Sequence, residues 1–185
     1  MVTFNDDNRF YTRDANGCVL MNLPEIREGF FLGRTVKDRI QQFRFQRLST
    51  IRAGELPWKS PSEPIAVFHA LPFRSFVEEH QLSLKSLTIE DFRPPTTWRS
   101  CGKVHDVDGI YGCEEGRDGT CVNYIFVNYS GCIEALTVKS LSNYSPKFIG
   151  NPQFERQFID FIPRCIEIFR RLEIDPPVAL IAREE

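Results

Sequence analysis

The sequence predicts an α+β fold: a mainly antiparallel sheet of about five strands, a long C-terminal amphipathic helix and an N-terminal helical segment. Two observations lead to this prediction. Short apolar runs separated by Gly-bearing connections occupy residues 109–138, which is typical of antiparallel hairpins. An apolar stripe at helical spacing runs through residues 151–172, which indicates an amphipathic helix packed on that sheet.

The N-terminal residues predict a hairpin followed by two helices. Residues 9–13 alternate as a strand does, and DANG at 14–17 is a turn sequence because Asn-Gly adopts positive φ readily. A short helix is expected through Phe30. A longer helix is expected over residues 35–52, with Thr35 as its cap and Gly54 as its stop.

Five strands are expected in the rest of the chain. They cover residues 65–71, 109–113, 121–128, 132–138 and 178–182. The 121–128 strand carries apolar groups on both faces, which places it at the centre of the sheet and covers it on both sides. The helix over residues 151–172 contains Pro163, which should kink or split it near residues 160–162.

A connector rich in Pro and Ser at residues 55–63 divides the chain into two predicted domains, residues 1–55 and 56–185. The helix before this connector is the most basic segment. Its candidate nucleic-acid contacts are Arg34, Lys37, Arg39, Arg44 and Arg47. These charges scatter around the helical wheel, which is more typical of a solvated helix face. Arg47 falls on the apolar stripe, so it must extend to solvent or find a carboxylate.

Composition and motifs indicate the cellular compartment and argue against some classes of function. Six cysteines without a C-x-x-C pair, and an N-terminus unlike an export signal, predict reduced thiols and a cytoplasmic chain. No stretch approaches the roughly 20 apolar residues of a membrane span, so no membrane partner is expected. Gly-rich phosphate loops, a nucleophile elbow and H-E-x-x-H do not occur, which argues against the commonest nucleotide-binding and hydrolase classes.

A metal site is an alternative interpretation of one region. Its candidate ligands are Cys101, His105, Cys113 and Cys121. Their spacing lacks the tight knuckle of a zinc finger or ribbon, so no metal ligand is assigned. The neighbouring acidic residues are Asp106, Asp108, Glu114, Glu115 and Asp118. They are typical of solvated loops, although they could support metal-dependent chemistry beside His105. His69, on an apolar strand, is more typical of a core residue than of a catalytic base.

Long stretches of the chain resemble one bacterial family. The first is RFYTRDANGCVLMNLPEIREGFFLGRTVKDRIQQFRFQRLSTIRAGELP at residues 9–57, and the second runs from VDGIYG through NYIFVNYSGCIEAL to LEIDPPVAL at residues 107–180. With IAVFHALPF, they resemble the C-terminal portion of proteins that carry a Schlafen AlbA-type domain and are described as DNA-binding or ATP-binding. The resemblance implies that residues 9–31 close the AlbA-type domain, whose body would lie upstream. It supplies no active-site residue for this chain.

The resemblance and the missing motifs together predict a non-catalytic accessory, sensor or oligomerisation module, without a cofactor, of a nucleic-acid-associated AlbA-type protein. The expected partners are a second copy of the chain or a chain that carries the upstream AlbA-type domain. Direct nucleic-acid binding through the basic helix at residues 34–52 is the first alternative. A metal-dependent enzyme that uses His105 and the acidic loop is the second.

Overall fold

The computed structural model of the chain describes residues 2–3, 10–14, 17–20, 22–59, 65–77, 81–95, 102–115, 120–137 and 152–184. Within these ranges it contains two α-helices and two antiparallel sheets, which confirms the α+β class. The chain divides into two compact units, Met1–Phe43 and Arg44–Glu185. The division lies inside helix α1 (Leu23–Ala53). The reason is that Leu48 and Ile51, near the end of α1, belong to the core of the second unit.

The first unit begins with a small antiparallel sheet. Its strands, in sheet order, are β1 (Val2–Thr3), β2 (Phe10–Asp14) and β3 (Gly17–Leu20). Asp14 pairs with Gly17, so β2 and β3 form the hairpin that the DANG sequence predicts. Gly17 has a φ of 130°, a backbone conformation that favours glycine at this turn.

Helix α1 is continuous over 31 residues, so the prediction of two helices was wrong. Gly33 lies inside it, and a glycine weakens a helix by about 1 kcal/mol relative to alanine without ending it. The predicted stop is confirmed. Gly54 has a φ of 71°, its N–H donates to the carbonyl of Ile51, and the N–H of Glu55 donates to the carbonyl of Thr50. This pair of bonds is a Schellman motif, which satisfies two carbonyls that the helix end leaves open.

The larger sheet has six antiparallel strands among the described residues, one more than the sequence predicts. In sheet order they are β5 (Gly102–His105), β6 (Gly109–Glu115), β7 (Cys121–Asn128), β8 (Ile133–Thr137), β4 (Ala66–Pro72) and β9 (Val178–Glu184). The unexpected strand is β5, a four-residue edge strand with the sequence GKVH. Such a short, polar segment has no alternating apolar pattern, so pairing with β6 makes it a strand. β7 is central and buried along its middle, as predicted.

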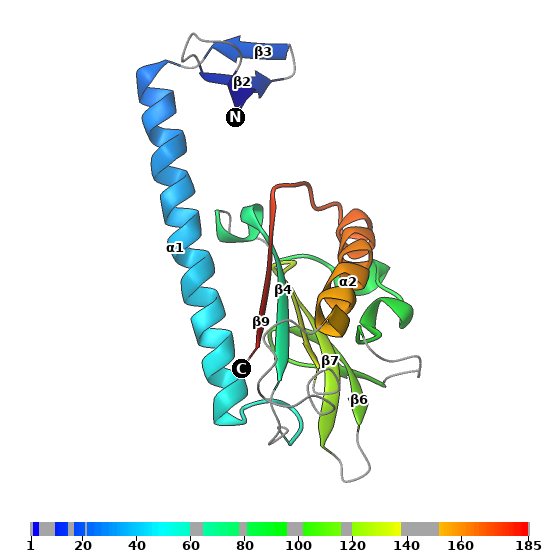
Figure 1. Ribbon diagram of the computed structural model, residues 1–185. Helices are drawn as coiled ribbons and strands as arrows, with labels where there is room; N and C mark the ends of the chain where they lie inside the picture. Colours follow the sequence, from blue (N-terminus) through cyan, green and yellow to red (C-terminus); the bar gives the residue numbers. More distant parts are fainter. Residues whose placement is uncertain are drawn as a thin grey trace. The chain divides into compact units, whose positions relative to one another are not determined.

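Alternating side chains give this sheet two apolar faces, and each packs against helix residues; Figure 1 shows α2 over one of them. Helix α2 (Pro152–Arg171) lies against one face, where Phe161, Cys165 and Ile168 join the core. The opposite face packs against Leu48 and Ile51 from the last turns of α1. The second unit is therefore layered as helix, sheet and helix end, which is a stable arrangement for a sheet with two apolar faces.

Helix α2 runs unbroken through Pro163, so the predicted split near residues 160–162 does not occur. Proline removes the N–H that would bind the carbonyl of Ile159, four residues earlier. Both residues lie on the exposed side of the helix, with Ile159 62% exposed. Water can therefore hydrate this carbonyl.

Between β4 and β5, the described residues include three short 3-10 helices, and one of them packs so closely on the sheet that it requires a glycine there. They are η1 (Phe73–Phe76), η2 (Leu84–Ser86) and η3 (Glu90–Phe92). Phe92 is fully buried, and its backbone crosses directly over Gly112 of β6. A Cβ atom at Gly112 would lie 1.8 Å from the carbonyl oxygen of Phe92, so only glycine fits here.

Gly112→Ala should therefore destabilise the second unit by about 2 kcal/mol, because overpacking forces the η3 backbone away from the sheet. Urea denaturation at neutral pH measures this loss. Gly102→Ala is the matched control on the neighbouring strand β5, where a Cβ would meet nothing within 4 Å. The control should change the free energy of unfolding by less than about 0.5 kcal/mol. Equal stability of the two variants would contradict the close approach of Phe92.

Candidate functional site

One row of side chains crosses four neighbouring strands of the larger sheet. His69 on β4 is in register with Glu134 on β8, Glu134 with Phe126 on β7, and Phe126 with Tyr111 on β6. Residues in register on adjacent strands share a face of the sheet. The antiparallel pairing thus brings together side chains that are far apart in the sequence.

Helix α1 adds a guanidinium to this row. Arg47 donates from Nη2 to Glu134 Oε1 at 2.7 Å and from Nε to Glu134 Oε2 at 3.1 Å, a two-point contact. Its Nη2 also donates to the hydroxyl of Tyr111 at 3.0 Å. The side chains of Arg47 and Glu134 are 14% and 1% exposed. Of the two outcomes predicted for Arg47, extension to solvent or pairing with a carboxylate, the structure shows the second, and the carboxylate is Glu134.

Every acceptor site of the Glu134 carboxylate is occupied. Oε1 also accepts from the hydroxyl of Tyr124 at 2.7 Å, and Oε2 lies 3.0 Å from His69 Nε2. Because an ionised carboxylate only accepts hydrogen bonds, the hydrogen of this last contact sits on His69 Nε2. Two oxygens have about four lone-pair sites, and four contacts fill them. We call Arg47, His69, Tyr111, Tyr124 and Glu134 the Glu134 cluster.

Aromatic rings enclose the Glu134 cluster. The Phe126 ring stacks on Tyr111 with 4.1 Å between ring centroids, and the guanidinium carbon of Arg47 lies 4.8 Å from the Phe126 centroid. Trp58 contacts the Tyr111 ring edge-on at 5.3 Å and stacks on Tyr124 at 6.5 Å. These rings keep water away, which strengthens the polar contacts inside and raises the penalty for losing any one of them.

The enclosed charges shift each other's protonation. Burial alone would raise the pKa of Glu134, but the hydrogen bond from His69 and the positive charge of Arg47 outweigh burial and lower that pKa to about 2. Burial disfavours the charged form of Arg47, yet Glu134 outweighs this effect and raises its pKa. Burial raises the pKa of Tyr124 well above its ordinary value, and Glu134 adds to that effect.

These properties favour a structural role for the Glu134 cluster. A carboxylate with a pKa near 2 is a weak proton acceptor at neutral pH, where catalytic bases have pKa values closer to 7. Its four acceptor sites are already used. The cluster ties the end of helix α1 to strands β4, β6, β7 and β8 by charge-assisted hydrogen bonds.

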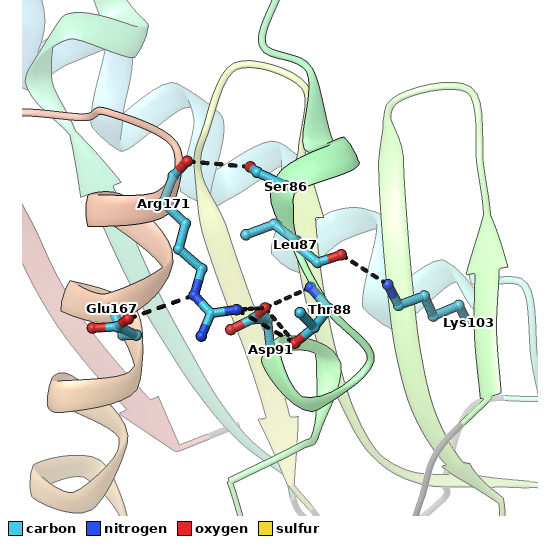
Figure 2. A network of polar contacts seen from close by, with 7 residues as sticks. All are labelled: Ser86, Leu87, Thr88, Asp91, Lys103, Glu167 and Arg171. Atoms are coloured by element: carbon cyan, nitrogen blue, oxygen red, sulfur yellow. Dashed lines mark hydrogen bonds and ion pairs between the residues drawn. The ribbon is translucent and has the colours of Figure 1, made fainter.

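A second polar cluster surrounds Asp91, a buried residue of η3. Its Oδ2 accepts from the backbone N–H of Thr88 at 2.6 Å, from the Thr88 hydroxyl at 2.8 Å and from Arg171 Nη1 at 2.9 Å. Glu167 of α2 holds the other side of the Arg171 guanidinium, as Figure 2 shows. Asp91 is 5% exposed, so this contact fixes the η2–η3 segment to the C-terminal end of α2.

The same segment is held from the other side by β5. Lys103 Nζ donates to the carbonyl of Leu87 at 3.2 Å and lies 4.5 Å from the centroid of the Phe92 ring. Ser86 donates to the carbonyl of Arg171 at 3.2 Å (Figure 2). These contacts explain why a segment without regular periodicity has a defined place on the sheet.

The five predicted nucleic-acid residues are divided between different environments. Arg47 belongs to the Glu134 cluster, and Arg44 is half-buried in the same part of α1. Arg34, Lys37 and Arg39 are exposed and belong to the Met1–Phe43 unit. The exposed basic surface of this helix is therefore smaller than the sequence suggests.

The candidate metal ligands do not all lie together. Cys101 and Asp118 lie outside the described residues. Cys113 and Cys121 are buried with their sulfur atoms 3.3 Å apart, whereas His105 is exposed at the far end of β5. Gly102, and not His105, is the β5 residue in register with Cys113. His105 lies three residues further along β5 than Gly102, a distance of about 10 Å along the strand.

The acidic residues of this region do not converge either. Asp106 and Asp108 are exposed at the turn between β5 and β6, while Glu114 is buried near the opposite end of β6 and accepts from Asn123 Nδ2 at 2.6 Å. Among the residues that the structure describes, no three His, Cys, Asp or Glu side chains lie close enough together to hold a metal ion.

Sequence reasoning missed Glu134 and both tyrosines of the Glu134 cluster. A signal for Glu134 was present, because this acid lies inside the apolar run CIEAL. Arg47 carries the matching signal, a base on an apolar helix stripe. A buried charge needs a partner of opposite charge, so these two exceptions could have been paired.

No helix within the described ranges is both long and apolar enough to cross a bilayer. No family model matches the chain, and neither a curated protein nor a solved structure matches it.

Proposed function

We propose that this chain is a non-catalytic accessory module of a nucleic-acid-associated AlbA-type protein. The Glu134 cluster supports the non-catalytic part, because its polar atoms are engaged with one another and stabilise the attachment of α1 to the sheet. The module thereby supplies a firm base for the last turns of α1. Its partner is an AlbA-type domain on a separate chain or upstream in a longer one.

The observation that carries the AlbA-type partner is a group of exposed apolar side chains in the first unit. Val19, Leu20 and Leu23 are 45%, 52% and 60% exposed. They fall within residues 9–31, the segment that the resemblance assigns to the closing edge of an AlbA-type domain. Large apolar side chains that stay exposed within one short segment are available to a partner that covers them.

The proposal predicts that the 185-residue chain binds a separately produced AlbA-type domain from a protein that it resembles, as measured by isothermal titration calorimetry. Leu20→Asp combined with Leu23→Asp should weaken this binding at least roughly tenfold, because two apolar contacts lose about 1.4 kcal/mol or more. Val107→Asp is the matched control, since Val107 is 90% exposed and belongs to the other unit. Absence of binding, or equal weakening by the control, would overturn the proposal.

Direct nucleic-acid binding is a second candidate, favoured by the exposure of Arg34, Lys37 and Arg39 on one helix. Fluorescence anisotropy with labelled duplex and single strands separates it from the accessory role. Phosphate contacts make affinity fall with salt, with a log–log slope of about −0.9 per contact on duplex. The accessory role predicts no saturable binding by the chain alone.

The second candidate would instead predict binding that a triple glutamine variant at these three positions abolishes. The matched control replaces three exposed cations elsewhere, Lys59, Lys85 and Arg156, by glutamine. Both triple variants have the same net charge. A difference between them would therefore report on contacts at the helix and not on overall charge.

A further inference from the structure

Helix α2 has a second apolar stripe, on the side turned away from the sheet. Ile159 and Ile166 are 62% and 45% exposed, Pro163 is exposed, and Ile162 is half-buried between them. Positions 159, 162 and 166 follow spacings of three and four, the spacing of a helix-pairing seam. The sheet-facing stripe, which includes Phe161, Cys165 and Ile168, is separate and fully covered. The outer stripe therefore does not contribute to the packing of the core.

The residues of this outer stripe are arranged with two-fold complementarity. When two copies of α2 run antiparallel about a point between Ile162 and Pro163, Ile159 of one copy faces Ile166 of the other. Under the same operation, Glu155 of one copy faces Arg170 of the other. Both charged residues are exposed, so they flank the apolar contact at its two ends. A self-complementary patch of this kind is what a C2 interface requires.

We propose that this outer face of α2 binds the same face of a second copy of the chain, as an antiparallel helix pair. The charge pattern favours a second copy over an unrelated partner, because each end of the stripe already carries the opposite charge of the other end. The ion pair that Arg170 can form within its own chain competes only weakly with the contact to Glu155 of the second copy. Arg170 lies 3.7 Å from Glu167, but both side chains are largely exposed, and exposed pairs of this kind contribute little.

This inference does not rest on the AlbA-type partner. The surface assigned to that partner includes Leu20 and Leu23 of the first unit, whereas α2 belongs to the second. A monomeric chain that still binds an AlbA-type domain would overturn the helix pair alone. A dimer that binds no AlbA-type domain would overturn the proposed function alone.

Sedimentation velocity of the 185-residue chain tests the pair at neutral pH. We expect reversible dimers over roughly 5 to 500 µM, because one helix face is smaller than the roughly 1,200 Å² of stable interfaces. Glu155→Arg should weaken dimerisation roughly tenfold, since two attractive pairs become repulsive in the symmetric dimer. Arg170→Glu should weaken it equally. The doubly exchanged chain, with both changes, should recover the affinity of the natural sequence.

Mixing the two single variants gives the sharpest readout. Glu155→Arg leaves only positive charge at the ends of the stripe and Arg170→Glu leaves only negative charge, so the mixture should form heterodimers roughly tenfold more tightly than either variant alone forms homodimers. Asp160→Arg is the matched control, an acid-to-base change on α2 outside the stripe, and it should leave the dimer unchanged. Equal circular dichroism spectra establish that each variant is folded.

Three outcomes would overturn the helix pair. The first is a natural chain that stays monomeric throughout the range. The second is a dimer whose affinity does not respond to Glu155→Arg and Arg170→Glu, or that Asp160→Arg weakens as much. The third is a monomeric chain in which Glu155→Arg instead weakens binding of the AlbA-type domain, which would assign the outer face of α2 to that partner.

Discussion

Replacing Glu134 by leucine is expected to destabilise the second unit by about 3–5 kcal/mol, because it leaves Arg47 buried without a counter-charge. Glu134 is 1% exposed and accepts hydrogen bonds at both oxygens, so water cannot take its place without repacking. Domains of this size have a total stability of about 5–15 kcal/mol. Urea denaturation at pH 7, followed by circular dichroism, measures the loss.

A double-mutant cycle separates the ion pair from the packing around it. Arg47→Met added to Glu134→Leu should restore part of the loss, since removing both charges eliminates the unpaired one. Recovery should be incomplete, because the Tyr124 hydroxyl loses its acceptor in the apolar core, at about 1–3 kcal/mol. Adding Tyr124→Phe should recover a further part. Exposed Glu55→Gln is the control and should change stability by less than about 0.5 kcal/mol.

A contradictory result is easily recognised in this series. If Glu134→Leu cost no more than Glu55→Gln, then the ionised carboxylate would add nothing to stability. If the double variant were as unstable as Glu134→Leu, then the loss would come from packing and not from the unpaired guanidinium. In either case, the Glu134 cluster would not be what holds helix α1 on the sheet.

Acid should remove about 3 kcal/mol of stability through Glu134 alone. Its pKa falls from an ordinary 4.5 to about 2 in the folded chain, and each pH unit of difference corresponds to about 1.36 kcal/mol. A depressed carboxyl pKa stabilises the folded state at pH values above the ordinary pKa. Below it the unfolded chain takes up the proton first, so the contribution is lost progressively between about pH 4.5 and about pH 2.

The difference between two variants isolates this contribution from the other carboxylates. The free energy of unfolding of the natural chain should fall by about 2 kcal/mol more than that of Glu134→Gln between pH 7 and pH 3. Glu55→Gln should follow the natural chain over the whole range. Parallel acid curves for the natural chain and Glu134→Gln would show that Glu134 has an ordinary pKa and is not held ionised by Arg47 and His69.

The spacing of apolar side chains predicted those helices and strands that are long enough to show a clear period. The predicted bounds agree within one or two residues for strands β4, β7 and β8 and for helix α2. Each of these elements carries a run of apolar side chains at a clear period. The Gly54 stop was predicted because positive φ is a local property of glycine. The sixth strand was missed because β5 becomes a strand only through its pairing with β6.

Of the candidate site, only Arg47, a base on the apolar stripe of α1, was identified from the sequence, and Glu134, the acid inside β8, was missed. Their pairing joins Arg47 to Glu134 across 87 positions of the chain. The spacing of side chains within one segment cannot reveal such a contact, because the contact depends on how β4, β8, β7 and β6 are ordered in the sheet. The register of β5 against β6 pairs Cys113 with Gly102, at the opposite end of β5 from His105, and so separates residues that the sequence places close together.

By itself, the sequence determined the α+β class, most of the strands, the amphipathic face of α2 and the end of α1. Each of these depends on side-chain period or on the φ of a single residue, and both are local. Tertiary structure alone decided which charges are paired and which surfaces remain open, including the saturated Glu134 carboxylate and the uncovered outer face of α2. The physical reason is that burial and ion pairing depend on neighbours in space, which sheet order and helix packing select.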